Sequence, residues 1–566
     1  MKNSILCLIL SALLFLSAHT CESGSRTPVR ARHGMVVAAD PLAARAGEKI
    51  LEAGGNAIDA AVATGFALAV TYPGAGNLGG GGFMVIRMAD GKTAAIDYRE
   101  KAPAASTRSM YLDSAGNFRP ELSTVGHLAV GVPGSVAGLL EALERYGTMK
   151  RAQVMTPALR LAEEGFPLSR ELAHGMQSMI PSFSKFPASM KSFTRHGLPY
   201  KEGEMWKQPE LARTLEAIAT NGRDGFYRGR VADLLVAEMK RGHGLITHKD
   251  LESYVPIVRD CVRGTYRGIE VISMPPPSSG GIALIQLLNI LEPFDLRSYG
   301  WNSAKSAHVM VEAMRRVYAD RAEYLGDPDF YTVPQRGLLS KRYAEAQRRT
   351  IDTERATKSA SVTHGVPVAY ESNETTHYSV VDRFGNCVSV TTTLNGAYGS
   401  CVTVEGAGFL LNNEMDDFSA KPGTPNMFGL IGAEANAIAP GKRMLSSMAP
   451  TILVKDHAPF MVVGSPGGST IITSVLQTIV NVIDYGMNIR EAIEAPRIHH
   501  QWLPDTLYYE RHSFSADTRT KLRQMGHVMQ ERRGTQGLVE GIVITPGEGV
   551  IEGASDPRGY GVAAGY

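Results

Sequence analysis

The chain has 566 residues, of which 44% are hydrophobic and 20% charged, and its formal net charge is +2 at pH 7. These values are typical of a globular protein long enough for more than one core-sized unit. The charge is nearly balanced and no long Lys/Arg face is present, so the composition excludes the electrostatic footprint of a nucleic-acid-binding protein.

The N-terminal segment, residues 1–21, predicts export. "MKNSILCLILSALLFLSAHTC" has one Lys, an apolar run and then small residues, which is the pattern of a secretory signal peptide. The run is short for a membrane span of roughly 20 residues; a retained anchor is the alternative. Cys21 follows "SAHT", a loose match to a bacterial lipoprotein cleavage site. We expect secretion across the inner membrane into the periplasm, with lipidation at Cys21 left open.

Residues 41–70 and 133–350 carry mostly helical patterns. "PLAARAGEKILEAGGNAIDAAVATGFALAV" is Ala-rich and predicts two helices broken at Gly54–Gly55. "FMVIRM" and "AAIDYRE" then predict a strand pair around "ADGK". Another strand is predicted at 268–274, and the remaining helical patterns cover 133–147, 231–242, 280–291 and 306–326.

The pattern changes after a polar stretch, 351–374, which is the best candidate for a linker. Four strands are predicted beyond it, at 377–382, 387–393, 450–456 and 459–465. Two helices follow, at 469–486 and 488–495. Strands followed by helices, without βαβ alternation, predict an α+β layered fold.

Two Gly-rich segments invite a functional interpretation. "GAGNLG" (74–79) matches the dinucleotide-binding pattern, but it follows a predicted helix and leads into a strand, which is the wrong context. "GSPGGS" (464–469) lies between a predicted strand and a predicted helix, where backbone N–H groups can stabilise an oxyanion. A tight turn without chemistry explains the second segment equally well.

The sequence predicts neither a metal site nor a disulfide framework. His499 and His500 are adjacent on a predicted strand, so their side chains point to opposite faces and we interpret them as structural. The five cysteines are too sparse for a set of disulfides. Cys387 and Cys401 either pair or, as we prefer, remain buried thiols.

The strands on both sides of "RFG" form a predicted hairpin. A three-residue loop with Gly385 last is a favoured hairpin turn, and it pairs Asp382 with Asn386. Counting back along this register places Thr375 opposite Thr393, close enough for their hydroxyls to interact. Ordinary strand threonines are the alternative.

A threonine hydroxyl needs a neighbouring base to become a nucleophile. The sequence places no His–Asp pair beside Thr375. If the chain is cut just before this residue, its own α-amino group becomes free, and such a group has a pKa of about 8. The position at the end of the predicted linker fits such a cut.

Nearly the whole mature chain resembles the γ-glutamyltranspeptidases, which are N-terminal-nucleophile hydrolases. In the family's order, the resemblance is carried by "NLGGGGFMV", "DYREKAP", "PPPSSGG", "ESNETTHYSVVD", "LLNNEMDDFSAKPG", "RMLSSMAPTI", "GSPGGS", "APRIHHQWLPD" and "GASDPR". It implies a four-layer αββα sandwich. It also implies self-cleavage between Glu374 and Thr375, giving a large subunit (22–374) and a small subunit (375–566) that share one core as a heterodimer.

The resemblance also implies residue roles, with Thr375 rather than Thr376 as the nucleophile. The implied catalytic residues are Thr375, Thr393, Gly467 and Gly468, and the implied substrate-binding residues are Arg99, Asn395, Glu414, Asp417, Ser446 and Ser447. In chemical terms, a planar guanidinium suits the α-carboxylate of a γ-glutamyl group, and the two acids suit its α-ammonium. A surface salt bridge or a helix cap is the alternative for each charged residue, and Asp416 competes with its neighbour Asp417.

The implied reaction starts with attack of Thr375 Oγ on the γ-amide carbonyl of glutathione or another γ-glutamyl compound. The α-amino group takes the proton, the two glycine N–H groups stabilise the oxyanion, and water or an amino acid or dipeptide resolves the γ-glutamyl ester. No metal or cofactor is needed. "KPGTPNMFGLIG" resembles the family's lid; Phe428 stands here where many bacterial members have Tyr, so the phenol hydroxyl is absent.

Two other functions compete with this one. Close relatives within the superfamily are acylases that remove glutaryl side chains from β-lactams, and the amino-acid clamp of Arg99, Glu414 and Asp417 argues against that choice. A catalytically dead, secreted binding lipoprotein is the second alternative, and it predicts an uncut chain.

Overall fold

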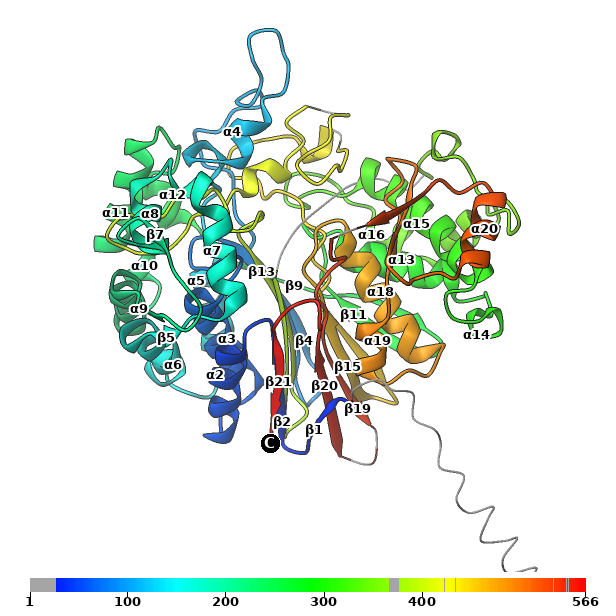
Figure 1. The fold of residues 1–566 in the computed structure, drawn as a ribbon, viewed down its shortest axis with the longest axis horizontal. Coiled ribbons are helices and arrows are strands. Elements are labelled where there is room, and N and C mark those ends of the chain that lie inside the picture. The colour runs from blue at the N-terminus through cyan, green and yellow to red at the C-terminus, as the bar shows by residue number, and fades with distance from the viewer. Residues whose placement is uncertain are drawn as a thin grey trace, which may run out of the picture.

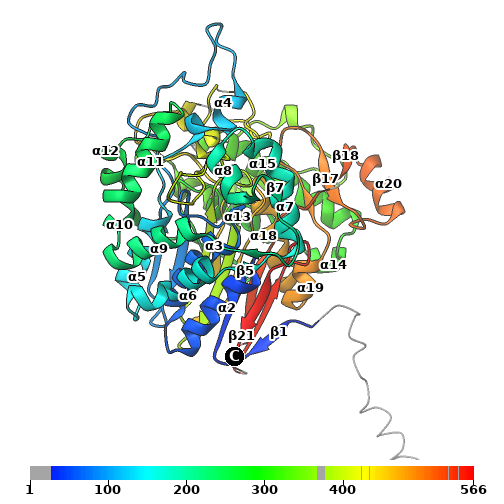
Figure 2. The ribbon, with the colours of Figure 1, turned by 60° about the vertical axis from the view of Figure 1, so that its left-hand side comes forward.

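Two stacked seven-stranded sheets form the centre of the molecule. The structure is a computed structural model, and it describes residues 27–365, 376–421, 423–432, 434–532, 534–545, 547 and 549–566. Figure 1 shows the two sheets between two layers of helices, and Figure 2 shows helices lying over the strands when the molecule is turned by 60°. The expected four-layer αββα sandwich is therefore confirmed.

The first sheet, which we call sheet I, has the predicted hairpin of residues 376–393 at its centre. Its strands, in spatial order, are β21 (Val562–Gly565), β2 (Gly34–Ala38), β12 (Thr376–Asp382), β13 (Cys387–Thr393), β3 (Gly81–Arg87), β4 (Thr93–Asp97) and β9 (Ile257–Arg259). Strand β12 pairs antiparallel with β2, and β13 pairs antiparallel with β3. Strands from the region before residue 374 thus flank β12 and β13 on both sides.

The hairpin has the register that the sequence predicts. Thr376 pairs with Thr392 and Val381 with Cys387, and the Asp382 N–H donates to the carbonyl of Asn386 over 3.1 Å. The turn closes through Gly385, whose φ of 87° lies in the left-handed region that favours glycine. The expected pairing of residue 375 with residue 393 falls one position outside the described part of β12.

Sheet II packs face to face against sheet I, and all of its neighbouring strands are antiparallel. Its strands, in spatial order, are β1 (Val29–Ala31), β20 (Val550–Ser555), β19 (Glu540–Thr545), β15 (Ala458–Gly464), β14 (Thr451–Lys455), β11 (Ile269–Ser273) and β10 (Val262–Tyr266). A buried apolar cluster fills the space between the sheets, with Phe83 and Val85 from sheet I and Ile452 and Val462 from sheet II. Burial on both faces explains why these strands are apolar in long runs.

Helices cover the outer face of each sheet (Figure 1). Sheet I is covered mainly by α2 (Pro41–Glu52), α3 (Ala57–Thr71), α5 (Ser135–Tyr146), α6 (Arg151–Glu164), α9 (Pro209–Asn221) and α11 (Gly229–Arg241). Sheet II is covered mainly by α13 (Gly280–Leu291), α15 (Ala304–Tyr324), α18 (Thr470–Ile483) and α19 (Ile489–Glu494). The predicted break between the first two helices is confirmed, because Gly54 has a φ of 93° and the Asn56 side chain caps α3.

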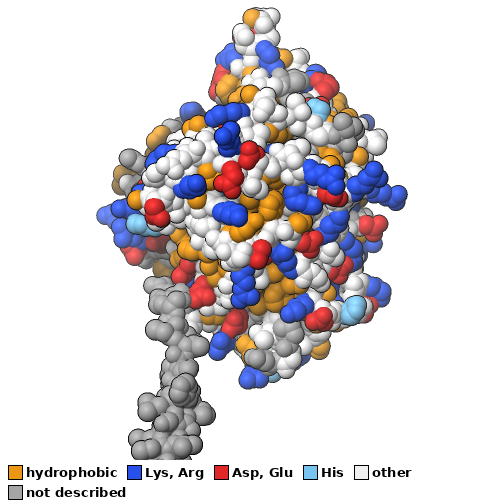
Figure 3. All heavy atoms as spheres, turned by 90° about the vertical axis from the view of Figure 1, so that its right-hand side faces the viewer, with side chains coloured by type: hydrophobic (Ala, Val, Ile, Leu, Met, Phe, Trp, Pro, Cys, Tyr) orange, Lys and Arg blue, Asp and Glu red, His pale blue; other side chains and the backbone are white. Residues whose placement is uncertain are grey.

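Further elements complete the described chain. They include α4 (Pro120–Thr124), α7 (Arg170–Phe183), α8 (Pro187–Phe193), α10 (Asp224–Tyr227), α12 (His248–Ser253), α14 (Leu296–Tyr299), α16 (Gln335–Leu338), α17 (Lys341–Arg348), α20 (Ala516–Gln524), η3 (Glu414–Asp417), β16 (Ile498–His499), β17 (Leu507–Glu510) and β18 (Met529–Arg532). In the described part of the chain, no helix is both long and apolar enough to cross a membrane. Figure 3 shows acidic and basic side chains interspersed over one face, with apolar patches between them.

The three cysteines of the described residues are free thiols. The preference for buried thiols at Cys387 and Cys401 is therefore confirmed. Burial raises the pKa of Cys387 to about 12 and that of Cys401 to about 11. The signal segment 1–21, with Cys21, lies outside the described residues.

Candidate active site

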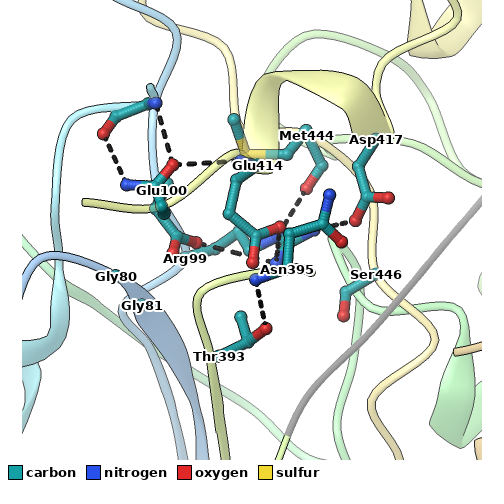
Figure 4. A network of polar contacts seen from close by, with 12 residues as sticks. Gly80, Gly81, Arg99, Glu100, Thr393, Asn395, Glu414, Asp417, Met444 and Ser446 are labelled. Atoms are coloured by element: carbon teal, nitrogen blue, oxygen red, sulfur yellow. Dashed lines mark hydrogen bonds and ion pairs between the residues drawn. The ribbon is translucent and has the colours of Figure 1, made fainter. Parts of the chain in front are cut away.

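A buried arginine occupies the centre of the site. Arg99 follows β4 by two residues, and its guanidinium donates to the backbone carbonyls of Met444 (3.1 Å) and Leu445 (2.9 Å). Its two terminal nitrogens lie 2.5 Å from Glu414 Oε2 and 2.5 Å from Asp417 Oδ2. Figure 4 shows these side chains turned toward one another. A planar fork held at several points is rigidly oriented, so the site is pre-formed.

The two acids that face Arg99 come from one short turn, η3. Glu414 and Asp417 are three residues apart, which brings their side chains to the same side of the turn. Asp416 points elsewhere, because its carboxylate accepts a 2.6 Å hydrogen bond from Ser123 Oγ. Of the two adjacent aspartates, the structure therefore brings Asp417 to the guanidinium.

A third carboxyl in the site, Glu100, was missed at the sequence level. Its Oε2 lies 3.6 Å from Arg99 Nη1, and the side chains of both residues are fully buried. The missing Cβ of Gly81 makes room for it, since a Cβ there would lie 2.5 Å from the Glu100 carboxylate. The run that matched a dinucleotide-binding pattern, residues 74–79, is also closely packed, since a Cβ on Gly79 would lie 2.1 Å from the Leu410 carbonyl oxygen.

The buried site is short of positive charge. One guanidinium faces three carboxyls, so full ionisation would leave uncompensated negative charge away from water. Burial raises the pKa of Glu414 to about 7, against the opposing pull of Arg99. Burial also raises the pKa of Glu100 and of Asp417 well above their ordinary values. Such a site is complementary to a ligand that brings an ammonium group.

Thr393 and Asn395 lie at the end of β13, next to the acids (Figure 4). Thr393 Oγ1 accepts a 2.7 Å hydrogen bond from the Asn395 N–H, which fixes Asn395 in a positive-φ conformation of 75°. The Asn395 amide nitrogen donates to the Asn413 carbonyl over 3.0 Å. Its buried Oδ1 has no hydrogen-bond partner among the described residues. A buried acceptor left open in this way favours a ligand that carries a donor.

Ser446 and Ser447 follow directly after the backbone carbonyls that hold Arg99. Ser446 Oγ accepts from the Met448 N–H over 3.2 Å, and Ser447 Oγ accepts from Arg321 Nη2 over 2.8 Å. Both serines are fully buried. Since each hydroxyl acts as an acceptor within the described chain, its proton remains available to an anionic ligand.

Gly467 and Gly468 lie between β15 and α18, in the context that the sequence predicts. Their φ values are 130° and 61°, and their carbonyls accept from the N–H groups of Thr470 and Ile471 at the start of α18. Their own N–H groups donate to none of the described residues. Two open N–H groups beside the start of a long helix form a favourable place for negative charge.

Glu374 and Thr375 lie outside the described residues, which resume at Thr376. The nearest histidine in the sequence, His377, is hydrogen-bonded at both ring nitrogens, to Thr391 and Ser379 at 3.0 Å each. Burial lowers its pKa to about 3. His377 is therefore a neutral, fully engaged side chain and is unsuited to act as a general base.

The predicted lid loop is joined to the site through Asn426. The Asn426 amide donates to Asp417 Oδ1 over 3.3 Å, and its carbonyl oxygen accepts from the Phe428 N–H over 3.0 Å. The Phe428 ring is half-buried against the core over sheet II, where it lines a cavity with Gln501 and Tyr508. Asn426 was not predicted from the sequence, because its role depends on the fold of the loop.

His499 and His500 form hydrogen bonds with different sets of side chains. His499 is bonded to Thr473 and Gln501, and His500 faces Asp505. Among the described residues, no group of three or more His, Cys, Asp or Glu side chains is arranged to hold a metal ion.

The γ-glutamyltranspeptidase family model matches residues 43–566, almost the full chain. The chain belongs to the γ-glutamyltranspeptidase family. The glutathione hydrolase proenzyme of Escherichia coli K12 is 51% identical to it over 544 residues, covering 95% of this chain and 93% of that protein. The acylase ACY 1 proenzyme of Pseudomonas sp. SE83 is 38% identical over 548 residues, covering 96% and 94%.

Solved structures agree with the family. Cephalosporin acylase from Bacillus halodurans has a TM-score of 0.87 at 30% identity, covering 97% of this chain and 98% of its own. The Helicobacter pylori γ-glutamyltranspeptidase chain has a TM-score of 0.58 at 46% identity, covering 61% of this chain and 97% of its own. The fold shared with the cephalosporin acylase thus extends over nearly the whole chain.

One further positioning residue joins two parts of this family's site. The Asn436 side chain donates to the Asp417 carbonyl over 2.6 Å and accepts from the Leu445 N–H over 3.3 Å. It therefore ties the turn with the acids to the segment whose backbone carbonyls hold Arg99. No local sequence signal identifies Asn436, because both of its partners are set by the tertiary fold.

Proposed function

We propose that the protein is a γ-glutamyltransferase and glutathione hydrolase. The observation that carries this proposal is the buried cluster of Arg99, Glu414 and Asp417, with the open acceptor of Asn395 beside it. The α-carbon of a γ-glutamyl group carries one carboxylate and one ammonium. The ammonium offsets the negative charge of the acids and donates to Asn395 Oδ1. The carboxylate binds the Arg99 guanidinium and accepts from the hydroxyls of Ser446 and Ser447.

In the proposed mechanism, Thr375 is the nucleophile. Its Oγ attacks the γ-amide carbonyl, its own α-amino group takes the hydroxyl proton, and the Gly467 and Gly468 N–H groups stabilise the oxyanion. The C–N bond breaks, the amine leaves with the proton, and a γ-glutamyl ester remains on Thr375. Water then releases glutamate, or an amino acid or dipeptide accepts the γ-glutamyl group. Thr393 supports Thr375 from the paired strand.

The nucleophile is generated by cleavage between Glu374 and Thr375. In our proposal Thr375 Oγ attacks the Glu374 carbonyl, the peptide is converted to an ester by an N-to-O acyl shift, and water hydrolyses the ester. The products are a large subunit ending at Glu374 and a small subunit, 375–566. We further propose that the signal segment directs the precursor to the periplasm, with an optional lipid anchor at Cys21.

Replacing the nucleophile tests this proposal. Thr375→Ala should abolish both chain cleavage and turnover of γ-glutamyl-p-nitroanilide, observed on a denaturing gel with N-terminal sequencing of the fragments. Thr376→Val is the matched control, because Thr376 Oγ1 is buried without a hydrogen-bond partner in the described chain and its loss should leave cleavage intact. An uncut parent protein, or cleavage of Thr375→Ala at the same bond, would contradict the proposal.

The acylase alternative has a structural likeness in its favour, the TM-score of 0.87 to a cephalosporin acylase. A glutaryl group lacks the α-ammonium, however, and would leave the acids of the cluster without a partner. We expect faster turnover of γ-glutamyl-p-nitroanilide than of glutaryl-p-nitroanilide. The opposite preference would favour the acylase.

A further inference from the structure

Arg99 lies just beyond the end of β4, in a segment without regular secondary structure. Two side chains bind its backbone there. Asp97 Oδ1 accepts from the Arg99 N–H over 3.1 Å, and the Tyr254 hydroxyl donates to the Arg99 carbonyl over 2.8 Å. Both side chains are buried, and burial raises the pKa of Tyr254 well above its ordinary value, so its hydroxyl remains a donor at neutral pH. The backbone of Arg99 is therefore held at both of its polar groups.

Asp97 also reaches the segment that holds the Arg99 guanidinium. Its Oδ1 lies 3.3 Å from Nε of Arg443, the residue directly before the two backbone carbonyls that accept from Arg99. Figure 4 shows one of these two residues, Met444, beside Arg99. The Arg443 guanidinium is buried and lies over the Tyr254 ring, 5.9 Å from its centroid. One carboxylate thus fixes both sides of the contact between Arg99 and its carbonyl acceptors.

The second oxygen of Asp97 is engaged as well. Asp97 Oδ2 accepts from Arg259 Nε of β9 over 2.9 Å, and the two terminal nitrogens of Arg259 donate to Asp329 over 3.1 and 2.7 Å. The Asp97 side chain is completely buried, whereas that of Asp329 is 41% exposed. A buried carboxylate with a donor on each oxygen has a fixed orientation. Asp97 is therefore a rigid support for the Arg99 backbone.

We propose that Asp97 and Tyr254 are positioning residues of the donor site, which hold Arg99 where its guanidinium meets the α-carboxylate of a γ-glutamyl group. This inference rests on the proposed function. Both residues act through Arg99, because their contacts are with its backbone. A small displacement of the guanidinium weakens its contact with a carboxylate, since two parallel N–H···O bonds must stay aligned. Loss of either residue should therefore weaken binding of the donor without changing the attacking group or the oxyanion site.

Steady-state kinetics of the full-length, processed protein test the inference. In Asp97→Asn the amide oxygen can still accept from the Arg99 N–H, but the charge that pairs with Arg443 is lost. The KM for γ-glutamyl-p-nitroanilide should rise by roughly 3- to 30-fold, and the inhibition constant of L-glutamate should rise by a similar factor. The kcat should change by less than about two-fold, because ground-state and transition-state binding of the α-carboxylate are weakened equally.

Tyr254→Phe removes one oxygen from the same support and is the milder variant. Its KM and its inhibition constant should rise by roughly two- to ten-fold at unchanged kcat, since one neutral hydrogen bond is lost. Asp329→Asn is the matched control. It changes the more exposed acid of the same ion-pair network, which pairs with Arg259, and it should behave as the parent. A denaturing gel and urea denaturation show whether each variant is cleaved and folded.

A merely structural role would give a different result. A smaller fraction of folded protein lowers the apparent kcat and leaves the KM and the inhibition constant unchanged. Parental values of both constants in Tyr254→Phe, or a rise in Asp329→Asn equal to that in Asp97→Asn, would overturn the assignment. If Asp97→Asn is not processed, Tyr254→Phe decides alone. Absence of γ-glutamyl-p-nitroanilide turnover in the parent would refute the proposed function instead.

Discussion

Asp416 and Asp417 are adjacent in the chain, yet they serve different partners. Asp417 holds the Arg99 guanidinium, while Asp416 accepts from Ser123 and from the Met427 N–H. Composition and spacing could not separate two neighbouring acids, and the choice came from the family's motif. The physical difference is one of direction, because successive side chains of a tight turn point to different sides.

This difference predicts unequal effects of two neutral substitutions. Asp417→Asn removes a charge-assisted hydrogen bond worth about 1.5–3 kcal/mol, so kcat/KM for γ-glutamyl-p-nitroanilide should fall by roughly 10- to 150-fold. Asp416→Asn should lower kcat/KM far less, since its partners do not meet the donor. Steady-state kinetics of both variants check this, and equal losses would contradict it.

Glu414 predicts a pH dependence of donor-site binding. Its pKa is raised to about 7, so the carboxyl is protonated below that pH and ionised above it. Only the ionised form attracts an α-ammonium, so competitive inhibition by L-glutamate should strengthen as the pH rises from about 6 to 8. The effect on stability has the opposite sign. The folded state holds the Glu414 proton more tightly than the unfolded chain, so the contribution of Glu414 to the free energy of unfolding falls as the pH rises from 4.5 through 7.

Inhibition constants for L-glutamate across this range measure the effect. In Glu414→Gln the inhibition should be weaker, and its rise near pH 7 should disappear. If inhibition of Glu414→Gln by L-glutamate strengthened with pH as much as that of the parent, the titrating group would be another residue.

At the scale of elements, local patterns predicted more than long-range ones. The β12–β13 hairpin could be predicted in register because Gly385 and a three-residue turn determine it locally. The break at Gly54–Gly55 had an equally local signal. No local signal predicts that the hairpin lies between β2 and β3, because strand order depends on partners far away in the chain.

The same limit applies to the site. Arg99 could be chosen with the family's help, but its third acidic neighbour, Glu100, was missed although it is adjacent in the sequence. A carboxyl beside an arginine on a loop usually faces water, and only the close packing against Gly81 turns it inward. Asn426 and Asn436 were missed because their partners, Asp417 and Leu445, are set by the tertiary fold.

The predicted linker is anchored over its described part. The Ser359 N–H donates to Asp505 Oδ2 over 2.9 Å, and Trp502 Nε1 donates to the carbonyls of Ser359 (3.0 Å) and Val362 (3.1 Å). Arg315 of α15 is nearly buried and forms an ion pair with Asp505. These bonds join residues before the proposed cut to residues after it.

Asp505→Asn should therefore destabilise the protein. It removes one of the two carboxylates that pair with the nearly buried Arg315, the other being Glu312 at 3.3 Å, and we expect the free energy of unfolding to fall by about 1–3 kcal/mol. Urea denaturation of the processed protein measures this. Glu345→Gln breaks an exposed pair with Arg349 and should change the free energy by less than about 0.5 kcal/mol. An unchanged midpoint for Asp505→Asn would show that the pair contributes nothing.

At the scale of the whole molecule, the proposed cut does not divide the fold into two bodies. Sheet II also mixes the two regions, since β11 from before residue 374 pairs with β14 from after it. The C-terminal strand β21 lies beside β2, and the carbonyl of Tyr566 accepts from the N–H groups of Arg32 and His33. Each region alone would expose unpaired strand edges and half of an apolar core.

We therefore expect that residues 22–374 and 375–566, expressed from separate plasmids and mixed, give no γ-glutamyl-p-nitroanilide turnover. The single precursor from the same host should yield an active pair that co-elutes in gel filtration. Active enzyme from the mixed fragments would contradict this expectation.

The central position of β12 and β13 also has an evolutionary consequence. If the gene were divided at codon 375, the β12–β13 hairpin would have to insert between β2 and β3 from a separate chain. Nothing would hold β2 and β3 apart before it arrived. Translation as one reading frame avoids this problem, because the gap and its occupant arrive on the same polypeptide. A single precursor thus encodes both fragments of the proposed cut in one gene, and the two fragments are inherited together.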